Sequence, residues 1–412
     1  MTQGFVSLKY FNVHHQAAAL LPSRSLACLI AVLCCFASPG QAHEWQWHGF
    51  LAQGVIQADK SNFINRSGDP SLALTELGLN GALQLQPNWR VAGQVVYLDG
   101  GNRYPDGLKL DYLFVDWALV NQLDWRLNLY AGRFKNQHWI YSSTRDVPLT
   151  RPSIVLPQSV YFDTFRDIAV SSDGLAFKAS VDTSAGHFEM NWSMGATPLS
   201  DKQTQLLLGD QVQGKSRQKY VQQASVFWQP ELSNWTLGVS LLDSEFSYRS
   251  SGESPFLDAD FVVQRFMLNA QYLQERWQLV AELFQERMDT KGFFAPGFEV
   301  QQFGQGGYLQ GLFKVSPDFR LNATLDYFVA NKDDRRGKQL ELSSQGTIPA
   351  YFGYQHSISL AASKDLAPRV RLQLEHHWVE GTGRLSPGVL PDLATNQDRY
   401  WQLWALQLMY WF

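Results

Sequence analysis

The feature that most constrains the fold is an alternation of apolar and polar residues that returns in sixteen segments. The segment 125–131, for example, reads WRLNLYA, with an apolar residue at every odd position. Successive residues of a strand point to opposite faces, so this pattern predicts strands with one apolar and one polar face. The predicted strands cover 45–59, 72–86, 89–97, 109–120, 125–133, 174–182, 188–194, 220–229, 235–241, 261–272, 277–286, 304–315, 319–327, 352–364, 370–378 and 404–412.

The connections between these segments alternate between short turns and long loops. Turns such as Pro87-Asn88 and Ser316-Pro317-Asp318 have two to five residues, whereas most of the other connections exceed ten. Bacterial outer-membrane barrels have an even number of strands, short periplasmic turns and longer external loops. The sequence therefore predicts an all-β fold, a transmembrane antiparallel up-and-down β-barrel of about 16 strands.

Aromatic residues make up 14% of the chain and recur at fixed places in this pattern. Amphipathic rings prefer the membrane–water interface, which explains why they return at the ends of spanning strands. In a soluble β-sandwich the outward faces would be polar, and Trp would have no reason to recur after turns. The predicted aromatic belt consists of Trp89, Trp125, Trp235, Trp277, Phe319 and Phe412.

Residues 1–42 read as a secretory signal peptide. They contain no acid, an apolar run from Ser25 to Ala37, and small residues at Gly40 and Ala42 before the predicted cleavage at His43. The alternative, a membrane anchor, needs about 20 apolar residues, and the run is shorter. The mature chain is thus predicted to be residues 43–412, forming one barrel in the bacterial outer membrane.

Cysteine content and charge exclude several kinds of site. All three cysteines lie in the signal peptide, so the mature chain has no disulfide, no thiolate metal site and no cysteine nucleophile. Removing Lys9 and Arg24 from the 34 basic residues leaves 32 against 38 acidic residues, a net charge of −6. This balance offers no basic footprint for nucleic acid. We find no spacing typical of a metal site, and we predict no cofactor.

One connection, residues 134–173, is far too long for an ordinary loop. Segments beyond about 12–15 residues without secondary structure are usually functional or disordered. Disorder is not expected, because this one contains many aromatic and aliphatic residues, Trp139 and Tyr161 among them. Pro148, Pro152 and Pro157 forbid a continuous helix or a central strand. We predict that the segment folds inward after the fifth strand and constricts the lumen.

In its architecture the chain resembles a Gram-negative outer-membrane porin over essentially all of 43–412. The resemblance rests on sixteen strands, the longest loop after the fifth strand, and the terminal Phe412. It implies that the long loop sets the narrowest section of a pore and that the barrel-assembly machinery reads the last strand. It also implies outer-membrane lipid as the environment, small polar solutes or ions as the cargo, and association of the barrels as a homotrimer.

A local resemblance concerns Gly132-Arg133-Phe134-Lys135, Arg145-Asp146 and Arg151-Pro152, which are similar to porins of the phosphate-selective superfamily. The chain departs from that pattern because it has no long ladder of lysines or arginines. Anion selectivity therefore does not follow from the resemblance.

A constriction needs charged groups across a narrow water-filled gap, where low-dielectric walls focus their field. The long segment supplies both signs, with Arg145, Arg151 and Arg166 expected on the cationic side. Inward-facing positions of the strands supply further charges. The predicted constriction and pore-lining residues are Arg133, Lys135, Arg145, Asp146, Arg151, Asp163, Arg166 and Asp167, with Arg90, Asp116, Arg126, Lys178, Glu282, Arg320, Asp326 and Arg371 on the wall.

Simpler interpretations accompany each of these predictions. The pairs Arg145-Asp146 and Arg166-Asp167 could merely hold the loop against the wall. The arginines that follow short turns (Arg90, Arg126, Arg320 and Arg371) ring the inner mouth or pair with acids there. Inward aromatics such as Tyr112, Phe114 and Tyr308 form either a sugar-stacking track or packing under the loop.

Three functions fit this sequence. The first is a passive diffusion porin for small hydrophilic solutes or ions, without enzymatic activity. The second is a barrel enzyme of the lipase or protease type, although no ordered Ser/His/acid arrangement is visible and adjacent His376 and His377 point to opposite faces. The third is a structural or adhesion barrel whose lumen the long segment closes.

Overall fold

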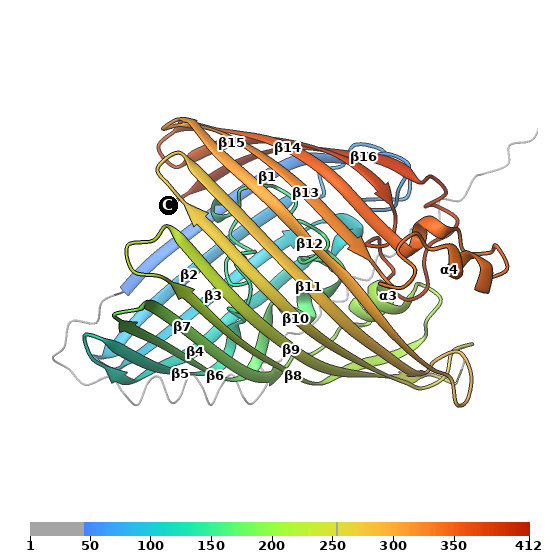
Figure 1. Ribbon diagram of the computed structural model, residues 1–412, viewed down its shortest axis with the longest axis horizontal. Coiled ribbons are helices and arrows are strands. Elements are labelled where there is room, and N and C mark those ends of the chain that lie inside the picture. Colours follow the sequence, from blue (N-terminus) through green and yellow to red (C-terminus); the bar gives the residue numbers. More distant parts are fainter. Residues whose placement is uncertain (1–44, 253) are drawn as a thin grey trace, which may run out of the picture. The chain divides into compact units, whose positions relative to one another are not determined.

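The computed structural model describes residues 45–252 and 254–412; the predicted signal peptide and its cleavage point before His43 lie outside the described residues. The predicted fold class is confirmed: sixteen antiparallel strands form one closed barrel, in which each strand pairs with its sequence neighbours and β1 pairs with β16 (Figure 1). The strands are β1 (Trp45–Ala58), β2 (Thr75–Gln86), β3 (Trp89–Asp99), β4 (Gly107–Asn121), β5 (Trp125–Lys135), β6 (Ser171–Thr183), β7 (Gly186–Ala196), β8 (Gly214–Gln229), β9 (Trp235–Ser250), β10 (Ala259–Leu273), β11 (Trp277–Gly292), β12 (Glu299–Ser316), β13 (Phe319–Val329), β14 (Tyr354–Ala367), β15 (Val370–Gly381) and β16 (Tyr400–Trp411).

Several strands extend beyond the alternating segments. The eighth was predicted to begin at Tyr220 and the ninth to end at Leu241, whereas β8 begins at Gly214 and β9 ends at Ser250. Strand pairing continues there beyond the apolar stretch, and Lys219 forms ion pairs with Glu245 on β9 and Asp260 on β10. The apolar alternation therefore marks the lipid-facing part of each strand rather than its full length.

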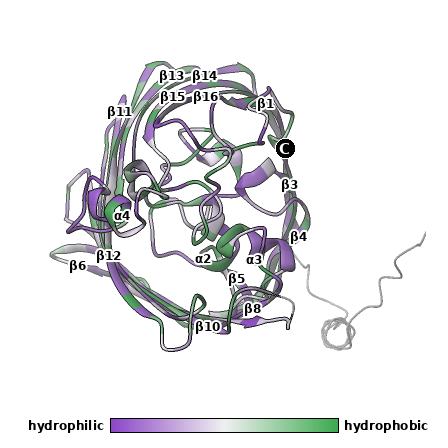
Figure 2. Cartoon of the chain, turned by 90° about the vertical axis from the view of Figure 1, so that its right-hand side faces the viewer, coloured by the Kyte–Doolittle hydropathy of each residue, from purple (hydrophilic) through white to green (hydrophobic). Residues whose placement is uncertain are grey.

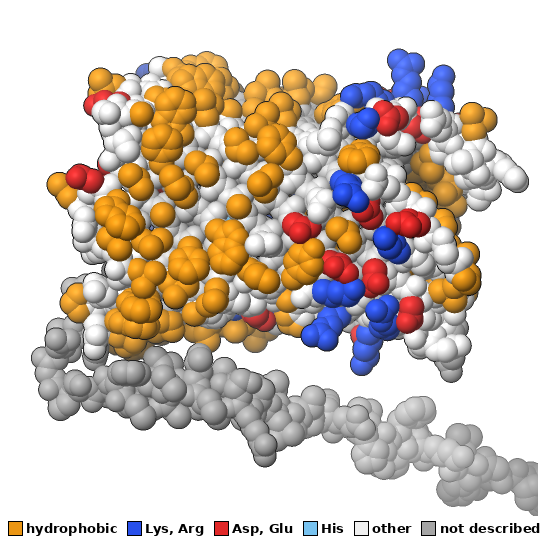
Figure 3. All heavy atoms as spheres, turned by 60° about the horizontal axis from the view of Figure 1, so that its bottom comes forward, with side chains coloured by type: hydrophobic (Ala, Val, Ile, Leu, Met, Phe, Trp, Pro, Cys, Tyr) orange, Lys and Arg blue, Asp and Glu red, His pale blue; other side chains and the backbone are white. Residues whose placement is uncertain are grey.

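Apolar side chains cover the outer face toward the short turns, while charged side chains gather toward the long loops (Figure 3). The predicted belt residues lie where expected, since Trp89, Trp125, Trp235, Trp277 and Phe319 each open a strand directly after a short turn. The four tryptophans are exposed on the outer face, and Trp89 stacks on Trp117 with ring centroids 4.9 Å apart. Their role as a membrane belt stays a prediction.

Short helices occur in the long loops: α2 (Arg166–Ala169), α3 (Asp201–Leu208), α4 (Lys338–Ser343) and the 3₁₀ turns η1 (Gly101–Arg103), η2 (Pro148–Thr150), η3 (Asp163–Phe165) and η4 (Ala350–Gly353). Among the described residues, none of these helices has the length and apolarity that a membrane-spanning helix requires. Seen from the long-loop end, several loops lie inside the ring of strands (Figure 2).

Candidate functional site: the inward loop and the wall around it

The long connection between β5 and β6 lies inside the barrel, as predicted, and is slightly shorter than the predicted 134–173. Strand pairing includes Phe134 and Lys135 at one end and Ser171 to Asp173 at the other, so the loop proper is 136–170. We call this segment the inward loop. Its prolines fit irregular backbone, with Pro148 opening η2, and its chain then returns to β6 through η3 and α2.

Polar wall residues hold the inward loop almost all around the lumen. Its hydrogen-bond partners come from β2, β7, β8, β9, β10, β11, β12, β13 and β15. Two wall carboxylates are central to this contact. Glu282 accepts from the backbone N–H of Ile140 at 3.0 Å and from the hydroxyls of Tyr161 and Tyr308, while Asp326 accepts from Ser159 N–H at 3.2 Å.

Apolar packing accompanies these hydrogen bonds. Trp139, Tyr141 and Tyr161 of the loop lie in one buried cluster with Phe284 and Tyr308 of the wall. Tyr308 therefore packs under the loop, and it does not belong to an open track of rings. A second cluster joins loop residues 154 and 155 to β1, β15 and β16.

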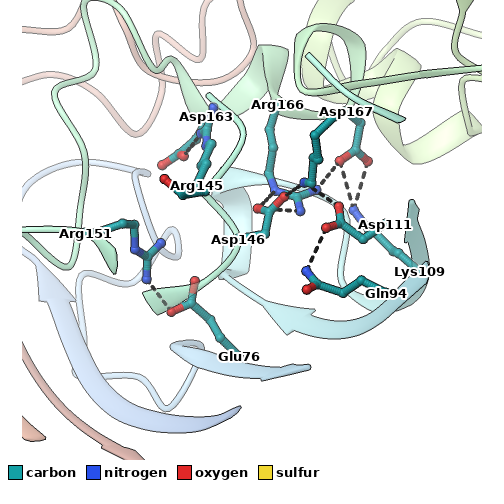
Figure 4. Close-up of polar contacts among 12 residues, drawn as sticks. Glu76, Gln94, Lys109, Asp111, Arg145, Asp146, Arg151, Asp163, Arg166 and Asp167 are labelled. Atoms are coloured by element: carbon teal, nitrogen blue, oxygen red, sulfur yellow. Dashed lines mark hydrogen bonds and ion pairs between the residues drawn. The ribbon is translucent and has the colours of Figure 1, made fainter. Parts of the chain in front are cut away.

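A network of buried ion pairs fastens the inward loop to the wall formed by β2 to β5 (Figure 4). Its first centre is Arg166, which lies 2.7 Å from Asp146 and 2.5 Å from Asp167. Asp146 also pairs with Lys135 at the end of β5, and Asp167 with Lys109 on β4 at 2.8 Å. Arg166 is 5% exposed, so these charges interact in a largely water-free setting.

The second centre is Asp163, which lies between two arginines. It lies 2.7 Å from Arg103, which follows β3, and it also pairs with Arg145 of the loop. Arg151 makes a separate pair with Glu76 on β2 at 2.6 Å. We call the whole set the loop charge network: the cations Arg103, Lys109, Lys135, Arg145, Arg151 and Arg166 with the acids Glu76, Asp111, Asp146, Asp163 and Asp167.

The loop carboxylates of the network are ionised at neutral pH. Burial alone would raise the pKa of Asp146, but Arg166 and Lys135 hold this pKa well below its usual range. The same competition leaves a lowered pKa at Asp163, through Arg103 and Arg145, and at Asp167, through Arg166 and Lys109. The loop cations Arg145 and Arg166 therefore each face a charged partner.

These contacts agree with the simpler interpretation of the loop charges, with one change of partner. Arg166 pairs with Asp167 as that interpretation supposed, whereas Arg145 pairs with Asp163 and not with its neighbour Asp146. The loop charges thus anchor the loop through matched pairs. It stays a prediction that the loop charges also create an electric field that acts on solutes in the lumen.

The prediction that Arg133 reaches into the lumen is wrong. Arg133 has the strand parity of Leu129 and Ala131, which places it on the outer face, where it pairs with Asp173 of β6 at 2.6 Å. The physical reason is that Arg133 is still paired within the sheet, opposite Leu113 on β4 and Asp173 on β6, so it keeps their outward orientation; only Lys135, at the end of β5, turns toward the loop.

Below the inward loop, toward the short turns, the wall carries a different set of charges. Arg90, Arg126 and Lys178 face inward there, and within the described residues none of them has a carboxylate within ion-pair distance. Asp116 lies in the row that contains Arg90 and accepts a hydrogen bond from Asn128 at 2.6 Å. We call Arg90, Asp116, Arg126 and Lys178 the lower wall.

Aromatic side chains accompany the lower wall. Phe114 and Tyr130 stack face to face, with centroids 4.6 Å apart, and the Lys178 ammonium lies 4.5 Å from the Tyr130 ring. Tyr112 leans on Phe114 from the other side at 5.7 Å. Phe114 and Tyr130 therefore cover one face of each other, and Lys178 lies over the Tyr130 ring. That these rings form a sugar-stacking track stays a prediction.

The remaining two arginines after short turns behave as the alternative interpretation supposed. Arg320 and Arg371 both pair with Asp365, each at 2.7 Å. Arg371 also donates to the carbonyl of Leu149 in the inward loop at 3.2 Å. Of the arginines that follow short turns, Arg320 and Arg371 on one side of the barrel are ion-paired, whereas Arg90 and Arg126 on the other side form no ion pair among the described residues.

The predicted pore-lining set left out several residues of this site, including Glu375, which the strand pattern had already placed among the inward acids. Glu76 had a usable signal, because its place in β2 is on the inward face. Glu375 and His377 lie two residues apart and so share a face; they contact each other, and Glu375 accepts from the N–H groups of loop residues 154 and 155. Asp111 had no such signal, since the register shifts beside it.

A residue of another external loop completes the anchoring. Arg384, between β15 and β16, is 4% exposed, donates to the Ser159 carbonyl at 3.2 Å and lies 3.6 Å from the centroid of Phe328. Burial lowers its pKa to about 10, against the attraction of Glu286. The guanidinium stays charged at neutral pH and ties the external loop to the inward loop.

Solved structures of bacterial outer-membrane proteins are similar to this barrel. The trimer form of in-vitro folded OmpT of Vibrio cholerae has a TM-score of 0.55 at 11% identity, covering 90% of this chain and 100% of that chain. The anion-selective porin from Comamonas acidovorans gives 0.55 at 13% identity, with 90% and 100% covered. The outer membrane channel DcaP of Acinetobacter baumannii gives 0.55 at 8% identity, with 90% and 98% covered. At such identities the likeness establishes a porin-like fold. No family model and no curated protein sequence matches the chain.

Proposed function

We propose that this protein is a passive diffusion channel for small hydrophilic solutes or ions in the bacterial outer membrane. The observation that carries the proposal is the inward loop, held inside a transmembrane barrel by buried ion pairs above a wall on which Arg90 and Arg126 are exposed. An anchored loop of this kind sets a fixed aperture, and lumen charges select among the solutes that reach it. The names of two similar structures, an anion-selective porin and an outer membrane channel, agree with this function.

The same proposal includes export and assembly. Residues 1–42 would direct the chain across the inner membrane, and the aromatic last strand ending in Phe412 would be read by the assembly machinery. A trimer is part of the proposal because one of the similar structures is described as a trimer form. The exposed apolar outer wall supplies the surface for both lipid and neighbouring barrels.

A closed barrel is the second candidate, and a specific observation favours it. Apolar clusters join the inward loop to the wall on the β9–β13 side and on the β1, β15 and β16 side, so much of the lumen is packed like a core. A barrel closed in this way would serve a structural or adhesive role.

A barrel enzyme has weaker support from the geometry. Glu375 and His377 form an acid–His pair, but Glu375 is fully buried and its oxygens already accept two loop N–H groups. His138 lies between Ser193 and Ser225, and burial lowers its pKa to about 3, so it stays neutral. Neither arrangement joins an acid, a histidine and a hydroxyl within hydrogen-bond distance in the part of the chain that the structure describes.

Single-channel recording in a planar bilayer separates these candidates. A channel predicts uniform, long-lived conductance steps when the purified protein is added. A barrel that is folded, as judged by its heat-modifiable migration in gels, but gives no steps would contradict the proposal and favour the closed barrel.

A further inference from the structure

The long-loop end of the barrel contains a cavity that the channel proposal does not use. It encloses about 460 Å³ and lies among the start of β12, residues 330–353 with α4 and η4, and residues 382–396 before β16. Pockets for small ligands typically measure about 300–1,000 Å³. We call this space the outer cavity.

The lining of the outer cavity is polar and contains neither lysine nor arginine. Amide and hydroxyl groups dominate the polar part, with Gln302 from β12, Gln339 and Ser343 from α4, and Thr382 from the last external loop. Amides and hydroxyls both donate and accept hydrogen bonds, so they match the hydroxyl groups of a neutral solute. Without a cation in the lining, a phosphate or carboxylate would lose its hydration with no opposite charge in return.

Two carboxylates and three apolar side chains add to this character. Asp334 accepts the N–H of Leu340 through one oxygen at 3.0 Å, and Asp392 accepts from Thr395 N–H at 3.1 Å. The other oxygen of Asp392 accepts from the Asn62 amide and pairs with Arg66, each at 3.4 Å, so the remaining acceptor capacity that suits hydroxyl donors lies at Asp334. Leu340, Phe352 and Leu385 provide apolar surface against which the C–H face of a sugar ring packs.

The buried hydroxyl of Thr382 is a second, independent indication that the outer cavity takes a polar ligand. It lines the outer cavity, is 3% exposed, and its Oγ1 has no hydrogen-bond partner among the described residues. A buried hydroxyl without a partner costs free energy, so such groups usually meet a water or a ligand. A hydroxylated ligand, or the water it orders, satisfies this group.

We infer that the outer cavity binds a neutral carbohydrate at the external mouth of the barrel. The lining has the donors and acceptors for hydroxyl groups, apolar surface for ring faces, and no cation for anionic groups. The inference does not rest on the proposed channel, because binding at this cavity is measured without conductance.

The test is isothermal titration calorimetry on the full protein purified from membranes in detergent, with maltose as the neutral probe and gluconate as the anionic one. Maltose is expected to bind, and gluconate to bind at least tenfold more weakly. Two tryptophan variants on α4 are compared: Ser343→Trp fills the cavity, whereas Leu342→Trp adds the same ring at a residue that is 78% exposed and outside the lining.

Ser343→Trp should weaken maltose binding at least tenfold, and Leu342→Trp should leave it unchanged. A second comparison avoids any effect on α4: Thr382→Val should weaken binding severalfold, while Thr347→Val, an exposed threonine outside the lining, should not. No maltose binding by the unaltered protein, equal binding of gluconate, or equal effects of the cavity and control variants would overturn the inference. If maltose binds but no conductance is found, the channel proposal fails and the outer cavity stands.

Discussion

The loop charge network and the lower wall contain the same kinds of charged side chain, but the cations are ion-paired in the network and, among the described residues, not on the lower wall. In the network, cations such as Arg145 and Arg166 are buried and faced by carboxylates, so their fields cancel over short distances. On the lower wall, Arg90, Arg126 and Lys178 have no carboxylate within ion-pair distance among the described residues and lie toward the short turns. Under the proposed channel function this difference means a division of work, in which paired charges position the loop and unpaired charges act on solutes.

The largest expected effect comes from breaking the network at its centre. Arg166→Met leaves Asp146 and Asp167 with one cationic partner each, and removing one member of a buried pair costs about 3–5 kcal/mol. That free energy opposes the anchored state of the inward loop, so we expect larger and noisier conductance steps and new trypsin cleavage within 136–170.

The matched control is Arg336→Met, which removes an exposed arginine of an external loop and should change neither readout. If Arg166→Met kept the conductance and the protease resistance of the unaltered protein, the network would not be what anchors the loop.

Mild acidification is expected to have almost no effect on the anchoring of the inward loop. The pKa values of Asp146, Asp163 and Asp167 are lower in the folded protein than the unfolded value of about 3.9. Their stabilisation is therefore fully present above that value and is lost only as pH falls through the folded pKa values. Conductance should stay constant from pH 8 to pH 5 and change only below about pH 4.

Release of the loop near pH 6 would contradict this account of the carboxylates. His138 gives no reason for such a release, because burial lowers its pKa to about 3 and the imidazole stays neutral throughout this range.

The strands and the inward course of the loop were predictable because their signals are local. Period-two alternation and turn length decide which residues face lipid, and proline spacing excludes regular structure in the loop. The position of Arg133 was predictable on the same ground, since it shares the parity of Ala131 within the predicted strand, and its misplacement came from expecting the last residue of the strand to turn inward.

The pairing of the charges was not predictable, because it depends on where the loop crosses the wall. Arg151 meets Glu76 across 75 positions of sequence, and the backbone N–H of Ile140 meets Glu282 across 142. Parity placed Glu282 and Asp326 on the inward face, but only the path of the loop makes them anchors for its backbone rather than free lining groups. Arg90 and Arg371 follow equivalent turns, yet their contacts could not be told apart from the sequence. Arg371 pairs with Asp365 and contacts the inward loop, whereas Arg90 forms no ion pair among the described residues.

The most direct test of this division of work is the reversal potential under a salt gradient in planar bilayers. The double variant Arg90→Met/Lys178→Met removes two unpaired charges, each worth about 0.4 kcal/mol to an ion about 10 Å away in water. This energy has opposite sign for an anion and a cation, so each charge changes the anion-to-cation permeability ratio about fourfold. The double variant Glu76→Gln/Arg151→Met removes one buried pair and leaves the net charge unchanged. The account predicts a shift toward cations of about sixteenfold for the first variant and no shift for the second. A shift for the Glu76/Arg151 variant with none for the lower-wall variant would contradict it.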